Sequence, residues 1–313
     1  MAQLLVKSIR DEARNIKTFE LVDPGGAELR AFTAGAHIEF QLPGGSERQY
    51  SLCNDPVETH RYVVAVLREK ESRGGSQAFH HRVREGDFLQ SSPPQNHFPL
   101  DQRAMHFTLI AGGIGVTPLL SMAYKLNTLR KPFEFHMCAH SEDSLPFRKE
   151  LEAVVEPACM HFHITDGDPS RRLNVESLLE QPIPEGLVYC CGPQSLMDAV
   201  GQAASNWYAK NIRFEIFTPR TLDGSDKPFN VTIASTGQMI HVDSTTTILE
   251  ALRQNGIHHP FSCEVGLCRT CVTGYGEGEV EHRDQDVLSM EKRKKNLTVC
   301  VSRCLSAELV LDL

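Results

Sequence analysis

The stretch SCEVGLCRTC at residues 262–271 places Cys263, Cys268 and Cys271 in C-x4-C-x2-C spacing, and Cys300 follows further along the chain. Three nearby cysteines with a distant fourth are the ligand pattern of a plant-type [2Fe–2S] cluster. Three thiolates within nine residues surround one inorganic core only if the backbone curls tightly, and Gly266 tolerates the dihedral angles that this requires. The stretch therefore predicts a one-electron centre in an electron-transfer protein.

Two other interpretations of these cysteines are a structural zinc site and a set of disulfides. Structural zinc sites usually show paired C-x2-C knuckles, whereas this stretch has one such pair preceded by a four-residue gap. Disulfides are typical of exported chains, and the N-terminal residues alternate like a strand rather than a signal peptide. Both alternatives are less favoured than the cluster.

Composition sets the broad class. The chain has 313 residues, which suggests two or three domains, and no apolar stretch approaches the ~18 residues of a membrane helix. A formal net charge of −8 without a basic stripe argues against a nucleic-acid partner. Ten cysteines without an export signal indicate the reducing cytoplasm, and we expect most of those outside the cluster set to be buried apolar residues.

Residues 1–102 contain short apolar stretches with period-2 alternation, separated by Gly and Pro turn signals. This pattern predicts an antiparallel barrel or sandwich. Residues 103–218 instead alternate strand-length apolar runs with amphipathic helix-length stretches, which predicts a parallel sheet covered on both faces. We expect strands at 106–111, 133–139, 161–165, 187–191 and 213–217, and helices at 117–129, 146–155, 174–180 and 193–209.

Residues 219–228 are polar and turn-rich, and we interpret them as a linker to a third domain at 229–313. That domain opens with two predicted strands, 229–234 and 239–243. Thr247 with Glu250 three residues later is a capping-box signature for a helix, and Asn255-Gly256 is a plausible end for it.

A glycine-rich loop, AGGIGVTP at residues 111–118, lies between a predicted strand and a predicted helix. Glycines let the backbone approach a pyrophosphate, and a helix N-terminus offers free N–H groups. We expect Thr117 to cap that helix and Pro118 to occupy its first turn. The pattern G-x-G-x-x-P departs from the usual dinucleotide fingerprint, so an ordinary tight turn is the alternative. A second strand–helix loop, YCCGPQ at 189–194, would line the same crevice.

Two features of the barrel suit a flavin phosphate and ring. The strand RQYSL at 48–52 offers an arginine for a phosphate, a tyrosine for a ring face and a serine hydroxyl for a ring nitrogen. The turn RGGS at 73–76 precedes a predicted helix, which again favours phosphate. Each motif alone is weak, because an arginine at a strand edge is more often a solvated surface charge.

Together these motifs, in this order, resemble the ferredoxin–NADP reductase superfamily: R-x-Y-S-L, G-G-S, A-G-G-I-G-x-T-P and C-G-P. With the cluster domain at the C-terminal side, the chain resembles the phthalate dioxygenase reductase family, and it is similar to the vanillate O-demethylase reductases. The resemblance covers essentially the whole length. It implies an antiparallel flavin-binding β-barrel, a doubly wound parallel α/β nucleotide-binding domain and a C-terminal β-grasp ferredoxin domain.

The resemblance also implies site residues. Catalytic roles fall to Ser51, Thr117 and Phe217, with Ser51 near the reactive flavin nitrogen and Phe217 covering the ring; Phe217 as an ordinary core residue is the alternative. Residues implied in cofactor binding are Arg48, Tyr50, Ser51, Leu52, Ala65, Val66, Gly74, Gly75, Ser76, Gly112, Gly113, Gly115, Thr117, Pro118, Cys191, Gly192, Pro193 and Phe217. The cluster ligands are Cys263, Cys268, Cys271 and Cys300.

The resemblance implies FMN as the flavin, whereas many members of the superfamily use FAD. The short connection at 91–99 agrees with FMN, because it shows no extra aromatic loop for the adenine of FAD. The implied nucleotide is NADH: after strand 133–139 the chain has Glu142 and Asp143, and carboxylates beside the ribose would repel the 2′-phosphate of NADPH. These two residues would otherwise form a solvated turn.

The implied activity is that of the reductase component of a two-component aromatic oxygenase or demethylase. Such a protein takes a hydride from NADH onto FMN and passes single electrons through the [2Fe–2S] cluster to a Rieske-type terminal oxygenase, in a transient contact. We expect a monomer. The alternatives are a general NAD(P)H diaphorase, a flavohaemoglobin-like activity, and a cluster-based redox sensor that binds a partner.

Overall fold

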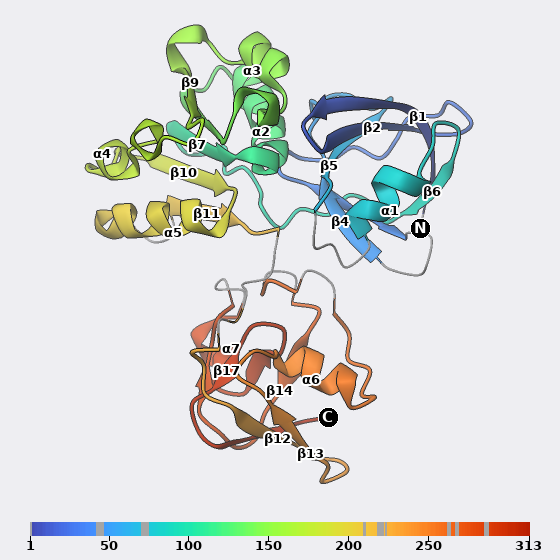
Figure 1. Cartoon of the computed structure of the whole chain (residues 1–313), viewed down its shortest axis with the longest axis vertical. Coiled ribbons are helices and arrows are strands. Elements are labelled where there is room, and N and C mark those ends of the chain that lie inside the picture. The colour runs from blue at the N-terminus through green and yellow to red at the C-terminus, as the bar shows by residue number, and fades with distance from the viewer. Residues whose placement is uncertain are drawn as a thin grey trace. The chain divides into compact units, whose positions relative to one another are not determined.

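The computed structural model describes residues 2–41, 47–69, 75–208, 211–217, 222, 224–261, 264–266, 269–284 and 288–313. The chain divides into two compact units, residues 1–215 and 216–313. Figure 1 colours the first unit from blue to yellow and the second in orange and red.

A six-stranded antiparallel sheet begins the first unit, in the order β4-β3-β6-β1-β2-β5. Its two end strands approach each other through a bridge between Leu52 and Val64, and the Cys53 amide donates to the Val63 carbonyl at 2.9 Å. The sheet therefore closes into the expected barrel, which protects its edges from pairing with other chains. Its strands are β1 (Ala2–Ala13), β2 (Ile16–Val22), β3 (His37–Gln41), β4 (Glu47–Ser51), β5 (Tyr62–Leu67) and β6 (Phe88–Ser91).

Alternation along these strands fills the barrel. Phe19 and Phe40 are fully buried, and helix α1 (Gly75–Arg82) adds Phe79 to the same cluster. The rings of Phe19 and Phe79 meet edge to face with centroids 5.1 Å apart, a favoured arrangement for aromatic pairs. This packing fixes α1 against the barrel.

A five-stranded sheet follows in the order β11-β10-β7-β8-β9, and each neighbouring pair is parallel. Its strands are β7 (His106–Gly112), β8 (Phe133–Ala139), β9 (Met160–Ile164), β10 (Gly186–Cys191) and β11 (Ile212–Glu215). The five predicted strands are confirmed, and none of their ends differs from the prediction by more than two residues. Helices α2 (Val116–Thr128) and α3 (Arg148–Val154) pack in one apolar cluster with the sheet, and Figure 1 shows α5 (Gln194–Ala203) on the opposite face.

The last predicted helix of this sheet, 193–209, is too long. Helix α5 ends at Ala203 and tightens into a 3-10 turn at Ala204–Asn206. Trp207 is then extended and buried, and its indole N–H donates to the Leu179 carbonyl at the end of α4 (Val175–Leu179), at 3.0 Å. The extended conformation of Trp207 allows its indole to bond this carbonyl. The helical periodicity of 193–209 does not reveal a contact with a residue so distant in the sequence.

The barrel and the parallel sheet share contacts within the first unit. Ile16, Val63 and Ala65 of the barrel belong to the same apolar cluster as α2 and the sheet. The Arg14 amide donates to the Asp143 carbonyl at 2.7 Å, and the Phe147 amide donates to the Glu12 carboxylate at 2.8 Å. The turn between β1 and β2 is therefore held against the segment that precedes α3.

The second unit contains a three-stranded sheet in the order β13-β12-β18, with β13 antiparallel and β18 parallel to the central strand. Helix α6 (Ile248–Gln254) packs on it through Ile248, Leu249 and Leu252, as in a β-grasp domain. The other elements are β12 (Phe229–Ile233), β13 (Met239–Val242), β14 (Val272–Gly274), β15 (Val280–Glu281), α7 (Met290–Arg293), β16 (Asn296–Thr298), β17 (Arg303–Cys304) and β18 (Glu308–Leu311).

The predicted limits of α6 are confirmed. The Thr247 hydroxyl accepts from the Glu250 amide at 3.1 Å, and Gly256 adopts a left-handed φ of 75° directly after the C-cap residue Asn255. These contacts satisfy amide and carbonyl groups that the helix ends leave unpaired.

A buried arginine joins separate parts of the second unit. Arg303 is 2% exposed and donates to the carbonyls of Thr246, Lys227 and Asp243 at 2.6, 3.0 and 3.1 Å. Asp226 lies within 3.8 Å of the Arg303 guanidinium and also pairs with Arg283 at 2.6 Å. Residues near the start of this unit are thus anchored to its C-terminal part.

Candidate functional site

The strand order of the parallel sheet creates a crevice. The chain adds β8 and β9 on one side of β7, then crosses over and adds β10 and β11 on the other. The loops that leave the carboxyl ends of β7 and β10 therefore diverge at a topological switch point, which is where open α/β sheets bind ligands. The predicted nucleotide loops, 111–118 and 189–194, are these two loops.

Backbone contact between the two loops explains their glycines. A Cβ on Gly115 would lie 2.2 Å from the Cys191 carbonyl oxygen, and one on Gly112 would lie 2.6 Å from Pro193 Cδ. A Cβ on Gly192 would lie 2.9 Å from the Gly112 Cα. These separations are shorter than any real Cβ contact, so the loops approach this closely only without side chains.

Gly113 has a different requirement. A Cβ there would meet open space, but its φ of 55° lies in the left-handed region. The residues Gly113–Gly115 form a 3-10 turn before α2, so Gly115 is the N-cap and helix α2 begins at Val116. This open, side-chain-free surface beside a helix start is suited to a pyrophosphate.

The predicted cap role of Thr117 is wrong. Because the 3-10 turn precedes α2, Thr117 is already the second helical residue, and its buried hydroxyl donates back to the Ile114 carbonyl at 3.0 Å. The hydroxyl therefore holds the glycine turn against the helix. Pro118 lies in the first turn of the helix, as predicted.

Glu215 is a residue of this crevice that the sequence did not reveal. It pairs with Cys191 in the register of β10 and β11 and is 7% exposed. Its Oε2 atom has no hydrogen-bond partner among the described residues. Burial raises the pKa of the carboxyl to about 8. Burial, followed by the nearby carboxyl, also raises the pKa of the Cys191 thiol, so that cysteine is protonated. The available signal in the sequence was a glutamate between apolar residues, in the stretch FEIF at 214–217.

Arg48 and Gly75 meet at the predicted phosphate end of the flavin site. A Cβ on Gly75, the first residue of α1, would lie 2.6 Å from Arg48 Nε. Glycine is thus required for the arginine side chain to lie across the start of the helix. A guanidinium beside a helix N-terminus fits a phosphate, and Ser76 next to it accepts from the Glu69 amide at 3.3 Å.

The other predicted flavin-binding residues at 48–52, on and directly after β4, are buried to different degrees. Tyr50 is partly buried and meets the Phe79 ring edge to face, with centroids 4.8 Å apart, and burial raises the pKa of its hydroxyl. Ser51 and Leu52 are buried at the end of β4. A fixed aromatic ring beside a small hydroxyl residue is compatible with one edge of an isoalloxazine ring.

Strand β5 brings the barrel to the nucleotide loop. Ala65 and Val66 are buried on β5, and this strand contacts the Gly113–Gly115 turn. The Val66 carbonyl is 2.8 Å from the His80 ring nitrogen Nε2, so that oxygen already has a partner. The structure therefore places the strand that carries the predicted flavin-binding residues Ala65 and Val66 against the nucleotide loop, within the first unit.

The acidic residues after β8 are paired with arginines. Glu142 lies 2.6 Å from the Arg148 guanidinium, and Asp143 lies 3.3 Å from that of Arg14. These ion pairs reduce the negative charge that the sequence suggested would repel a 2′-phosphate.

Two of the four predicted cluster cysteines come together in the second unit. Cys271 precedes β14 and Cys300 follows β16, and the antiparallel pairing of these strands brings their sulfurs to 3.1 Å. A disulfide would require about 2.05 Å. Two buried sulfurs at this distance can bind a single iron with a small adjustment, so the donor set fits the cluster.

The loop before Cys271 curls as expected. Gly266 has φ 75°, and Glu264 and Arg269 also adopt left-handed values of 56° and 65°. A Cβ on Gly266 would lie 2.8 Å from Val301, so this glycine is required by packing as well as by backbone conformation. Cys263 and Cys268 lie outside the described residues, as does Gly74 of the barrel. Phe217 is 42% exposed, and its role as the flavin cover stays a prediction.

Comparison with known proteins identifies the family. Residues 231–305 match a 2Fe-2S iron-sulfur cluster binding domain, and residues 109–202 match an oxidoreductase NAD-binding domain. The chain is 41% identical to phthalate dioxygenase reductase of Burkholderia cepacia, over 99% of this chain and 97% of the relative. The chain belongs to the phthalate dioxygenase reductase family.

Further similarities agree with this membership. A reductase subunit of tert-butanol monooxygenase / tert-amyl alcohol desaturase from Aquincola tertiaricarbonis is 40% identical over 99% of this chain and 95% of its own length. A solved structure of phthalate dioxygenase reductase superposes with a TM-score of 0.75, at 41% identity, covering 99% of this chain and 97% of that one.

As a member of this family, the protein is an NADH-dependent flavin and iron–sulfur oxidoreductase whose cofactors are FMN and a [2Fe–2S] cluster. None of the helices in the described part of the chain has both the length and the apolar character needed to cross a membrane.

Proposed function

We propose that this protein supplies electrons to a separate Rieske-type terminal oxygenase, as the reductase component of a two-component system. One observation supports this most directly: the flavin strands and the nucleotide loops meet within one unit, and the same chain continues into a cluster-binding domain. When bound, FMN supplies the chemistry that couples a two-electron hydride donor to one-electron acceptors.

The residues of the first unit have binding and positioning roles in this proposal. Arg48 and the start of α1 bind the flavin phosphate, and Tyr50 with Ser51 orients the ring. Gly112, Gly113 and Gly115 admit the pyrophosphate of NADH, opposite Gly192 and Pro193, and the Thr117 hydroxyl keeps the glycine turn in place. The role that the sequence predicts for Phe217, as the cover of the flavin ring, belongs to the same proposal, although Phe217 follows the first unit in the chain.

In the second unit, Cys263, Cys268, Cys271 and Cys300 hold the cluster. The chain works as a monomer in the reducing cytoplasm and contacts its oxygenase transiently, because electron-transfer contacts are typically small. The relatives are named for phthalate and for tertiary alcohols, so the class of substrate is set by the oxygenase rather than by this chain.

Replacing a cluster ligand tests the electron path. We expect Cys300→Ala to retain NADH oxidation with ferricyanide, which accepts electrons from the flavin. Reduction of cytochrome c by NADH should fall at least about tenfold, because it needs the cluster. Cys304→Ala is the matched control, since Cys304 is a buried cysteine of the same unit outside the predicted ligand set. Unchanged cytochrome c reduction in Cys300→Ala would contradict the path.

The oxygenase partner needs its own test. A purified Rieske oxygenase from the same organism should oxidise its substrate with NADH only when this protein is added. A general diaphorase would reduce cytochrome c equally well but leave the oxygenase inactive. Sedimentation of the two proteins, alone and mixed, would test the monomer and the transient complex.

A further inference from the structure

A group of histidines lies on one face of strands β8 and β9, away from the residues assigned above. Alternation puts Phe135 and Met137 of β8, with Phe162 of β9, on the face that packs with α2. The intervening residues Glu134, His136, His161 and His163 therefore lie together on the opposite face. In the parallel register His136 is the partner of His161.

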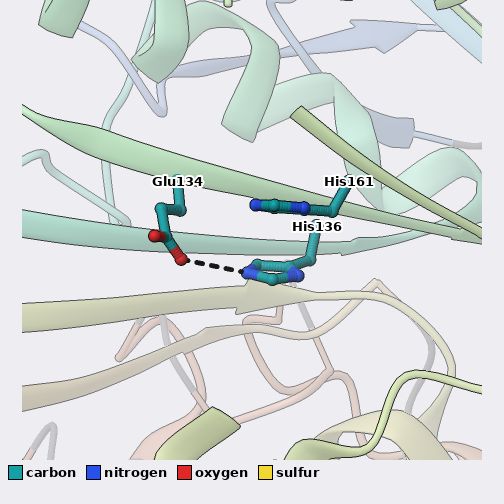
Figure 2. Close-up of side chains that lie close together, drawn as sticks. All are labelled: Glu134, His136 and His161. Atoms are coloured by element: carbon teal, nitrogen blue, oxygen red, sulfur yellow. Dashed lines mark ion pairs between the residues drawn. The ribbon is translucent and has the colours of Figure 1, made fainter. Parts of the chain in front are cut away.

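The imidazoles form a stack. The ring of His136 lies 4.7 Å from that of His161 and 5.5 Å from that of His163, at angles of 19° and 16°. Figure 2 shows the His136 and His161 rings parallel, each with a nitrogen at the end that faces the Glu134 carboxylate. Three imidazoles and a carboxylate on neighbouring strands are an unusual set for a sheet whose other face is apolar.

Within the described part of the chain, one nitrogen of His136 has no hydrogen-bond partner. His136 is 5% exposed, and its Nε2 atom is buried. The Glu134 carboxylate lies 3.6 Å from Nε2, which is too far for a hydrogen bond. Its other nitrogen, Nδ1, lies 3.2 Å from His163 Nε2, which fixes the ring orientation. Metal-binding histidines are commonly oriented through the ring nitrogen that does not bind the metal, and His163 holds His136 Nδ1 in this way while Nε2 stays available.

We propose that Glu134, His136 and His161 bind a divalent transition-metal ion of the zinc class. Their donor atoms all lie within 4.8 Å of one another. With zinc–ligand bonds of about 2.0–2.2 Å, the 3.6 Å separation of His136 Nε2 and Glu134 Oε2 corresponds to a ligand–metal–ligand angle of about 120°. The Glu134 side chain is 55% exposed, so its carboxylate has room to move toward the ion. The half-buried His161 ring must turn out of its stack with His136, because an imidazole binds a metal through a lone pair in the plane of the ring.

Two histidines with one carboxylate leave a coordination position for water, and imidazole ligands favour zinc, copper or nickel over magnesium or calcium. His163 is a positioning residue in this arrangement, because it orients His136 without being a ligand. The ion would also connect the edge strand β9 to its neighbour β8.

The site is separate from the electron path. Glu134 is the second residue of β8 and His161 the second residue of β9, whereas the nucleotide loops follow the carboxyl ends of β7 and β10. Zinc binding should therefore require neither NADH nor the cluster ligands.

Zinc content of the complete holoprotein tests the proposal. Wild-type protein and variants are dialysed against micromolar Zn²⁺ with a weak competing chelator, and zinc and iron are measured in the same samples by mass spectrometry. We expect about one zinc per chain beyond any bound at cysteines, and a loss of that one equivalent in His161→Gln and in Glu134→Gln. His163→Gln should weaken zinc affinity about 10–100-fold, as expected when the group orienting a ligand is lost.

His106→Gln is the matched control, since His106 is an exposed histidine of the neighbouring strand β7. Iron content, flavin absorbance and ferricyanide reduction verify that each variant is folded and loaded. Equal zinc in wild-type protein, His161→Gln and Glu134→Gln would overturn the proposal, as would zinc binding that displaces iron and is unaffected by all three substitutions.

Discussion

The nucleotide crevice and the cluster loop both need unusual backbone, but for different reasons. At the crevice, Gly112, Gly115 and Gly192 are required because two loops touch backbone to backbone. In the cluster loop, non-glycine residues such as Glu264 and Arg269 also take left-handed conformations. The first site is limited by the space between two loops. The second is limited mainly by the curvature of a single loop, in which Gly266 also packs against Val301. A substitution in the nucleotide crevice should therefore act through clashes between the loops. In the second unit, a substitution should act by removing the contacts that anchor the cluster domain, such as those of Arg303.

The largest effect should come from filling the crevice. Gly115→Val places a side chain where even a Cβ would lie 2.2 Å from the Cys191 carbonyl oxygen. We expect NADH oxidation to fall more than about 100-fold and the first unit to lose about 3 kcal/mol or more, since backbone on both sides must shift. Steady-state kinetics with ferricyanide and chemical denaturation measure these losses.

Gly113→Ala is the matched control for this prediction. Its Cβ meets open space, so only the left-handed φ of 55° opposes it, at a cost of about 1–2 kcal/mol. If Gly113→Ala were as damaging as Gly115→Val, backbone conformation rather than contact between the loops would explain the crevice.

The second effect concerns the anchoring of the cluster domain. Arg303→Met removes the donors to the Thr246, Lys227 and Asp243 carbonyls and leaves Asp226 with less positive charge nearby. We expect a loss of about 3 kcal/mol in the second unit and faster loss of iron, because buried polar groups would lack partners. Cytochrome c reduction should decline on warming before ferricyanide reduction does.

Arg253→Met provides the comparison for Arg303→Met, because Arg253 has a 41% exposed side chain. Among the described residues it pairs with Glu264 at 3.7 Å and lies over the exposed Phe261 ring, 4.3 Å from its centroid. It should change stability by less than about 1 kcal/mol. Equal effects of the two substitutions would refute the anchoring role of Arg303.

The third effect is a pH dependence confined to the crevice. The pKa of Glu215 is raised by burial from 4.5 to about 8, so the folded chain keeps a proton that the unfolded chain releases. The stability of the first unit is therefore fully retained below pH 4.5 and falls as pH rises toward 8. We expect a loss of about 2 kcal/mol between pH 6 and 8, because the folded and unfolded chains differ by nearly one proton over most of this range. Glu215→Gln should flatten this slope in denaturation curves, and an unchanged slope would exclude Glu215 as its source.

The smallest effect should follow Glu142→Gln. Arg148 already offsets the Glu142 carboxylate, and both side chains are partly exposed. We expect less than about 1 kcal/mol of destabilisation, and less than about a threefold rise in kcat/KM for NADPH, because an exposed paired charge contributes little. A large gain in NADPH use would show that this carboxylate, despite its arginine, repels the 2′-phosphate.

The sequence was sufficient for much of the fold and for the cofactor classes. Period-2 alternation, strand–helix alternation and cysteine spacing are local patterns, so the barrel, the strands of the parallel sheet and the cluster loop were predicted from them. The errors arose from local rules that tertiary contacts override. Thr117 is not a cap because a 3-10 turn precedes the helix, and α5 ends early because the Trp207 indole reaches across to Leu179.

The amino-acid sequence by itself determined which elements form and which residue types are available for phosphate, flavin and iron. Only the tertiary structure decided which of them meet. Strand order placed Gly115 against Cys191, and strand register placed Glu215 beside Cys191 and His136 beside His161. These contacts join residues 24 to 76 positions apart. No local pattern encodes them, because they depend on how strands are ordered and aligned in the folded sheet.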